Sequence, residues 1–241
     1  MHTISPDVDR WSPTTTTYPN AVLGLYGSKS PELSVQGAIS ILDQPGIGFC
    51  GSRKASEQGI EIARDCAEQA VLDGYTVVSG YAAGVDEAAH HAALAAGGRT
   101  IIVLPEGINQ FRIRRSLKAV WDWDRVLVIS GFEPTAVWRA HQAMARNRLI
   151  VALSRAMIVI EAGETGGTLD AGRQTLAAQK PLFVVDYAAQ HAVGNPLLIA
   201  AGGMPLRRSR NTGRANLAEL LVRADRDAQL VRTAQTVLAL S

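Results

Sequence analysis

The sequence has few cysteines, few aromatic residues and no long apolar run. Its two cysteines, Cys50 and Cys66, lie in apolar stretches and match neither a disulfide framework nor the spacing of a zinc site. No run approaches the roughly 18 apolar residues that a membrane-spanning helix needs, and the N-terminus lacks the apolar core of a secretory signal. We therefore expect a cytoplasmic protein with no membrane partner and no metal site.

The composition is that of a folded globular chain. Hydrophobic residues make up 47% of the 241 residues and charged residues 19%, which excludes a wholly disordered protein. This length accommodates one α/β domain with short tails. We expect a flexible leader over residues 1–20, rich in Thr, Pro, Ser and Asp, a folded domain over residues 21–206, and a basic amphipathic helix over residues 207–241.

The charge is unevenly distributed along the chain. The formal net charge of +2 divides into +4 for residues 205–241, where seven arginines face three acidic residues, and −2 for the remainder. An arginine-rich tail favours an anionic partner but is equally typical of a solvated helix face. Apolar residues at helical spacing predict that this tail packs either on its own domain or on a second copy. They are Leu217, Leu220, Leu221, Ala224, Ala228, Val231 and Leu238.

Short, continuous apolar segments alternate with helical patterns through the central part of the chain. We expect strands at residues 47–50, 76–79, 100–104, 126–129, 157–160 and 182–185. We expect helices at residues 56–72, 86–96, 136–154 and 168–178. Strands that are continuously apolar are buried on both faces. The pattern therefore predicts an α/β fold with a mostly parallel sheet and helices on both faces.

Three glycine turns fall where such sheets bind ligands, at the carboxyl ends of strands. Each turn joins a strand to a helix, offers bare backbone N–H groups and receives the positive end of a helix, which together favour a phosphate. The guanidinium of Arg53 could add a bidentate grip. The candidate phosphate-binding residues are Gly51, Ser52, Arg53 and Lys54 in the first turn, Ser79, Gly80, Gly84 and Asp86 in the second, and Thr165, Gly166, Gly167 and Thr168 in the third.

The expected helix over residues 136–154 carries a further polar group, Arg146, Asn147 and Arg148. Residues two positions apart diverge on a helix. We therefore expect one arginine to face the rim formed by the turns and the other to pair inside the protein. His90 and His91 are adjacent on a helix and cannot chelate a metal together, so we interpret them as ordinary helix residues.

No pattern supports a bound nucleotide cofactor or a catalytic centre. Residues Gly46 to Gly51 spell GxGxxG, but the apolar strand lies inside this pattern instead of before it, so we predict no dinucleotide site. A P-loop pattern is absent from the sequence. The spacing of the acidic, serine and histidine residues defines no catalytic constellation. We therefore predict a non-catalytic protein without a cofactor.

Five motifs stand in order along the chain: GSRKASEQG, VVSGYAAGVDEAAHHAAL, GGRTIIVLPEGI, RNRLIVALS and EAGETGGTLDAGRQTLAAQKPLFVV. Together with the segment that approaches them, this set resembles the DprA (Smf) family of DNA-processing proteins over residues 18–198. The resemblance implies an extended Rossmann-like domain that binds single-stranded DNA in DNA uptake or recombination. It also implies RecA recombinase as a partner, loaded onto the DNA, and a homodimer. By position, Arg53 matches a family arginine that contacts the DNA backbone, and the other candidates except Lys54 and Thr165 match the family's turns and RNR motif.

The sequence departs from the family pattern in ways that predict weaker DNA binding. Ala83 stands where the second turn usually has an arginine. The stretch from Gln142 to Ala145 lacks the aromatic residue that often precedes the RNR motif, and a stacked base is worth roughly 1–3 kcal/mol. Members often carry a helical domain before this fold and a winged helix after it, and we expect neither here.

Two other functions stay open at this point. Nucleotide phosphoribohydrolases of the lysine-decarboxylase-like type share the architecture, and Gly167 and Thr168 match part of their motif. Ala171, however, stands where their catalytic glutamate would be, which leaves the acid/base role unfilled. A sensor that binds a small nucleotide at the same rim without turnover also fits the sequence.

Overall fold

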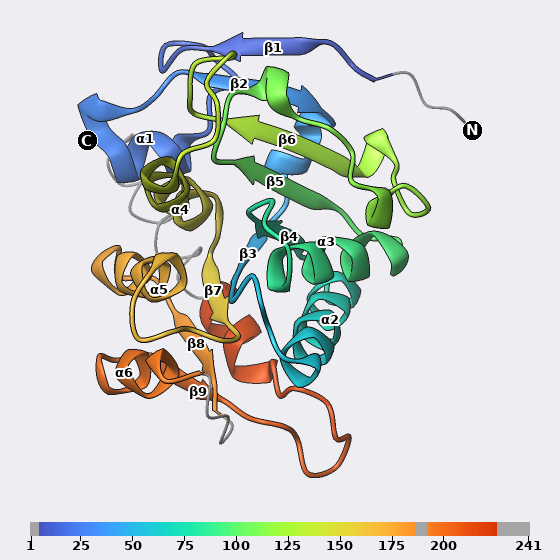
Figure 1. Cartoon of the computed structure of the whole chain (residues 1–241), viewed down its shortest axis with the longest axis vertical. Helices are drawn as coiled ribbons and strands as arrows, with labels where there is room; N and C mark the ends of the chain where they lie inside the picture. Colours follow the sequence, from blue (N-terminus) through green and yellow to red (C-terminus); the bar gives the residue numbers. More distant parts are fainter. Residues whose placement is uncertain (1–4, 187–191, 226–241) are drawn as a thin grey trace, which may run out of the picture.

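The computed structural model describes residues 5–186 and 192–225, which are built around one nine-stranded sheet (Figure 1). The strand order is β1-β2-β6-β5-β4-β3-β7-β8-β9. The seven strands from β6 to β9 run parallel to one another, and β2 and β1 extend the sheet in antiparallel pairs. The strands are β1 (Val8–Trp11), β2 (Leu33–Gly37), β3 (Gly46–Cys50), β4 (Thr76–Ser79), β5 (Thr100–Leu104), β6 (Val126–Ser130), β7 (Ala156–Val159), β8 (Leu182–Val185) and β9 (Met204–Leu206).

Helices cover both faces of the sheet, which is why every residue of β3 to β8 is buried. One core joins the sheet to α2 and α3, and another joins its opposite face to α1, α4, α5 and α6 (Figure 1). The predicted α/β fold with a mostly parallel sheet is confirmed. The helices are α1 (Asn20–Tyr26), α2 (Glu57–Leu72), α3 (Val85–Ala95), α4 (Ala140–Leu153), α5 (Gly167–Ala177) and α6 (Gly194–Ala200).

The N-terminal segment is folded from residue 8 onward, so the prediction of a flexible leader over residues 1–20 is wrong for this part. Strand β1 pairs with β2 at the edge of the sheet. Trp11 and Tyr18 are buried, and the Tyr18 hydroxyl donates a hydrogen bond of 2.6 Å to the Pro31 carbonyl. The segment is held by edge pairing and by two isolated aromatic side chains, a pattern that composition alone does not reveal.

Residues 207–217 form a loop, so the predicted C-terminal helix does not begin at residue 207. Arg208 and Ala215 form a β-bridge, and Arg214 makes ion pairs with Asp65 and Glu68 on α2. Residues 218–225 are helical, and Leu217, Leu220 and Ala224 are buried in the core beside α2. In its described part the tail therefore packs on its own domain; the predicted continuation to residue 241 lies outside the described residues.

Candidate functional site

The chain order of the sheet reverses at β3, which has β4 on one side and β7 on the other. Open parallel sheets bind ligands in the crevice at the carboxyl ends of strands at such a reversal. A cavity of about 380 Å³ opens there, between the loop after β3, α4 and the N-terminus of α5. We call it the switch-point cavity. Its lining residues are Cys50, Gly51, Arg53, Ala82, Asp86, Trp138, Ala140, Ala143, Met144, Arg146, Asn147, Ile150, Gly166, Gly167 and Thr168.

About half of the predicted site residues meet in this cavity. Eight of the fifteen line it: Gly51, Arg53, Asp86, Arg146, Asn147, Gly166, Gly167 and Thr168. The other seven lie beside it or elsewhere: Ser52, Lys54, Ser79, Gly80, Gly84, Arg148 and Thr165. All three glycine turns thus contribute to one place, because the carboxyl ends of parallel strands share one edge of the sheet.

Arg146 is the buried cation of the cavity. Its side chain is 6% exposed, and its Nη1 atom lies 4.0 Å from Asp86 Oδ2. Neither Nε nor Nη1 has a hydrogen-bond partner among the described residues. Burial lowers the pKa of Arg146, and the Asp86 carboxylate opposes that shift, so the guanidinium stays charged. Buried donors without partners are rare in native proteins, and here they favour an anionic ligand.

Three neighbouring residues fix the position of this guanidinium. Gly80 lies so close to Arg146 that a Cβ atom at this position would overlap the guanidinium. The Gly80 carbonyl is held in turn by Nε2 of the buried His90, at 2.5 Å. Asp86 accepts a hydrogen bond from the Ala82 N–H and lies in the first turn of α3, where a carboxylate is favourable. Gly80, His90 and Asp86 therefore position Arg146.

The second and third turns place helix starts at the sheet edge through glycines in left-handed backbone conformations. Gly84 precedes α3 with φ +80°, and Gly166 precedes α5 with φ +100°. The Asn147 side-chain amide donates to the Gly167 carbonyl at 2.9 Å and ties α4 to the start of α5. The N-terminus of α5 thereby faces the same cavity as Arg146. An anion there would meet both the guanidinium and the free N–H groups of the helix start.

Arg53 and Trp138 form the exposed mouth of the cavity. The Arg53 guanidinium lies over the Trp138 ring, 5.3 Å from its centroid, and Trp138 is 48% exposed. The expected aromatic position lay at residues 142–145, and Trp138 was not among the predicted site residues. The expected helix over residues 136–154 included Trp138, whereas α4 begins at Ala140 and Trp138 lies in the preceding loop. The signal that could have found it is the single tryptophan between the expected strand at 126–129 and the RNR motif.

Arg148, one of the candidates, lies outside the switch-point cavity. Its guanidinium lies over the Tyr26 ring at 4.7 Å and donates to the Leu25 carbonyl at 2.7 Å. It faces α1 because two positions along a helix turn a side chain to the other side. Ser79 is also structural: it is fully buried, and its hydroxyl donates to the Phe49 carbonyl at 2.7 Å.

The remaining reactive groups near the cavity are occupied or inactive. Burial raises the pKa of the Cys50 thiol to about 12, so it stays protonated. The Glu161 carboxylate accepts from the Ser56 N–H and hydroxyl and so fixes the start of α2. Within residues 5–186 and 192–225, no group of three His, Cys, Asp or Glu residues could hold a metal, and no helix could cross a membrane.

These features define an α/β protein of Rossmann type with a cavity at the reversal of its sheet. The sequence matches the model of the DNA recombination-mediator protein A family over residues 10–212, and the chain belongs to that family. The predicted DprA (Smf) resemblance is thereby confirmed.

Curated relatives and solved structures agree with this assignment. Protein Smf of Escherichia coli K12 is 32% identical over 200 residues, which is 81% of this chain and 50% of that protein. The DNA processing protein DprA of Streptococcus pneumoniae R6 is 32% identical over 155 residues, 64% of this chain and 54% of that protein. The chain thus spans about half the length of these relatives.

Two DprA structures share the fold. The X-ray structure of DprA from Streptococcus pneumoniae matches with a TM-score of 0.73 and 29% identity, covering 83% of this chain and 71% of that chain. A structure describing the single-stranded DNA binding mode of DprA from Helicobacter pylori matches with a TM-score of 0.72 and 23% identity, covering 83% and 90%.

Proposed function

We propose that this chain binds single-stranded DNA at the switch-point cavity, with a backbone phosphate held by Arg146. The observation that carries the proposal is the buried guanidinium whose Nε and Nη1 atoms lack partners in the described part of the chain. A phosphate oxygen is an acceptor that satisfies such donors with charge-assisted hydrogen bonds. The N-terminus of α5 on the opposite wall supports the same anion.

The mouth of the cavity favours an unpaired strand over a duplex. The Trp138 ring is half-exposed, so one base can stack on the face that Arg53 leaves open, and Arg53, which lies over the other face, can contact a neighbouring phosphate. A duplex keeps its base faces stacked on one another and cannot present one to Trp138. Aromatic stacking next to cationic side chains is the usual mode of binding single strands without sequence preference.

Alanine variants of Arg53 and of its neighbour Lys54, which serves as the matched control, test the proposal. Both are exposed cations in the same turn, but only Arg53 lines the cavity. We expect Arg53→Ala to weaken binding of a fluorescein-labelled 20-mer of dT about fivefold in anisotropy titrations at moderate salt, and Lys54→Ala to change it less than twofold. Equal effects of the two variants, or tighter binding of duplex than of single strand, would contradict the assigned cavity.

A parallel thermal-shift screen with mononucleotides separates DNA binding from nucleotide sensing. We expect the oligonucleotide to raise Tm and free nucleotides at equal phosphate concentration to leave it unchanged, because one nucleotide cannot engage Arg146, Arg53 and Trp138 together. A nucleotide that raises Tm more than the oligonucleotide would favour the sensor.

Family membership supports a finer proposal for the whole protein. We propose that it acts without catalysis in the cytoplasm, as a homodimer that loads RecA recombinase onto the bound strand. The test is RecA filament formation on single-stranded DNA with and without the chain, together with its mass in sedimentation equilibrium. Faster filament formation and twice the monomer mass are expected; no acceleration or a monomer would contradict these parts.

A further inference from the structure

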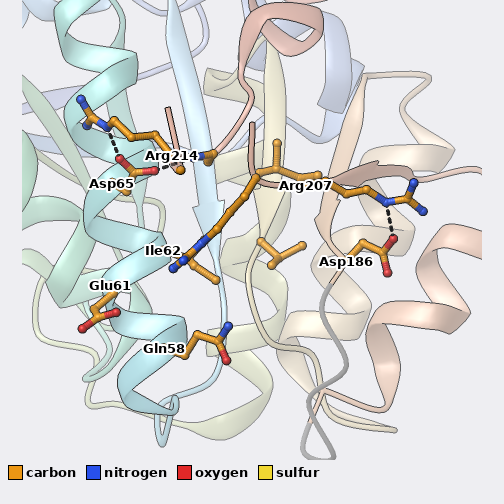
Figure 2. A pocket seen from close by; sticks show the side chains of 12 residues that line it. Gln58, Glu61, Ile62, Asp65, Asp186, Arg207 and Arg214 are labelled. Carbon is orange, nitrogen blue, oxygen red and sulfur yellow. Dashed lines mark hydrogen bonds and ion pairs between the residues drawn. The ribbon is translucent and has the colours of Figure 1, made fainter. Parts of the chain in front are cut away.

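A second cavity of about 380 Å³ lies at the carboxyl ends of β8 and β9, between α2 and the loop of residues 207–215 (Figure 2). We call it the α2–loop cavity. Its apolar lining comes from Ile62 on α2 and from Val185, Leu206 and Ala215. Two ion pairs stand at its sides: Arg207 with Asp186 at 2.7 Å, and Arg214 with Asp65 at 2.5 Å. Figure 2 shows these pairs at opposite sides of Ile62.

Three polar side chains that line this cavity have no partner within the described part of the chain. Gln58 and Glu61 extend from α2, one turn apart (Figure 2). Arg208 lies in the loop of residues 207–215. Across the described ranges, none of the three side chains makes a hydrogen bond or ion pair, although Arg207 and Arg214 on the same loop are both paired. The cavity thus combines an apolar floor with one free amide, one free carboxylate and one free guanidinium.

We propose that the α2–loop cavity binds one nucleotide of the same DNA strand that the switch-point cavity holds; this inference rests on the proposed function. The apolar floor suits a base, and the Glu61 carboxylate and Gln58 amide suit its polar edge. A carboxylate accepts from an exocyclic amino group, which cytosine has and thymine lacks. Arg208 takes the phosphate of that nucleotide, while Arg207 neutralises Asp186 and reduces its repulsion of the strand.

The sheet places the two cavities within reach of one strand. Both lie at the carboxyl edge but on opposite faces of the sheet, and β3 is separated from β9 by three strand spacings, so the strand must cover more than about 14 Å at ~4.8 Å each. At ~3.4 Å between successive phosphates, a stacked strand needs more than about four nucleotides to cover this span. Arg210, also exposed, lies on the same loop. A short oligomer can therefore occupy the switch-point cavity alone, whereas a longer one reaches both cavities.

The experiment compares strand lengths and two bases. Anisotropy titrations use labelled dT4, dT20 and dC20 with the wild type, Arg208→Gln, Glu61→Ala and the control Arg64→Gln. Arg64 is an exposed arginine on α2 that does not line the cavity, so its replacement removes the same charge. We expect Arg208→Gln to weaken dT20 binding about fivefold and leave dT4 unchanged, with Arg64→Gln having less than a twofold effect.

Glu61 gives an independent readout. We expect the wild type to prefer dC20 over dT20 about threefold and Glu61→Ala to abolish that preference. The ratio is decisive because removing a negative charge strengthens binding of every oligomer equally. Equal losses in Arg208→Gln and Arg64→Gln, or a dC20 to dT20 ratio unaffected by Glu61→Ala, would overturn the second subsite. Failure of dT4 to bind the wild type would instead overturn the proposed function, so the two failures are distinguishable.

Discussion

Two arginines on α4 show how differently one helix can use the same side chain. Arg146 is buried, faces the switch-point cavity and keeps two nitrogen atoms without partners in the described structure. Arg148 is exposed, lies over the Tyr26 ring and donates to the Leu25 carbonyl. Arg148 is satisfied within the fold, whereas Arg146 is left unsatisfied where water is scarce. Both side chains carry the same charge, so what distinguishes the candidate site is a buried donor without a hydrogen-bond partner in the described structure.

The unfavourable free energy of burying the Arg146 guanidinium supports its assignment to the candidate site. Burying a polar group without a hydrogen bond is unfavourable, and Asp86 at 4.0 Å gives only partial compensation. Such a cost in the free protein is offset when a phosphate enters. Replacing Arg146 should therefore lower the DNA affinity much more than the free energy of unfolding.

The largest effect is expected from Arg146→Met, which removes the charge and keeps much of the side-chain volume. DNA affinity should fall about 30-fold, because a charge-assisted hydrogen bond to phosphate is worth ~2 kcal/mol. Tm should change little, because loss of the partnerless donors offsets loss of the partial ion pair with Asp86, which keeps its bond to Ala82. Anisotropy and calorimetry measure both. A clear fall in Tm would assign Arg146 to the fold.

Gly80→Ala should come next, because its methyl group would displace the Arg146 guanidinium without altering any charge. We expect about a tenfold loss of affinity for dT20. Gly24→Ala is the control, since a Cβ atom there meets nothing within 4 Å. The same loss in both variants, or none at Gly80, would show that the position of Arg146 does not matter.

Trp138→Ala tests the mouth of the cavity. Removal of one stacking platform should weaken binding about fivefold, near the lower end of the 1–3 kcal/mol range because the ring is half exposed. Trp138→Phe should recover most of the affinity, which would separate stacking from the contact with Arg53. A Trp138→Phe variant as weak as the alanine variant would contradict a stacking role.

The smallest effect on DNA is expected from Arg148→Met, the counterpart of the first variant. Affinity for dT20 should change less than twofold. Loss of the contact with Tyr26 and of the bond to Leu25 should cost about 1 kcal/mol of unfolding free energy and lower Tm by roughly 3 °C. Calorimetry checks the stability. Binding loss as large as in Arg146→Met would erase the distinction between the two arginines.

The sheet and the meeting of the glycine turns could be predicted from the sequence. Continuous apolar strands imply a parallel sheet, and parallel strands bring Gly51, Gly80 and Gly166 to one edge whatever the packing details. The leader could not be predicted in the same way, since β1 owes its place to pairing with β2 and to buried Trp11.

The roles of individual residues in the candidate site could not be predicted without the three-dimensional structure. The sequence showed that Arg146 and Arg148 must diverge, but the rotational phase of α4, set by its packing on α1 and α5, decides which one faces the cavity. Trp138 became a site residue only because the loop before α4 folds over Arg53. The sequence shows several arginines in the loop of residues 207–215, and only the structure shows that Arg207 and Arg214 make ion pairs whereas Arg208 makes none within the described residues.

The salt dependence of dT20 binding tests the central claim most directly, because its slope counts the phosphates that the protein neutralises. Each neutralised phosphate on a single strand contributes about −0.7 to the slope of log K against log salt concentration. Arg146→Met should make the slope shallower by about 0.7, and Arg148→Met should leave it unchanged, although each variant removes one positive charge. An unchanged slope in Arg146→Met, or the same change in both variants, would contradict a phosphate held by Arg146.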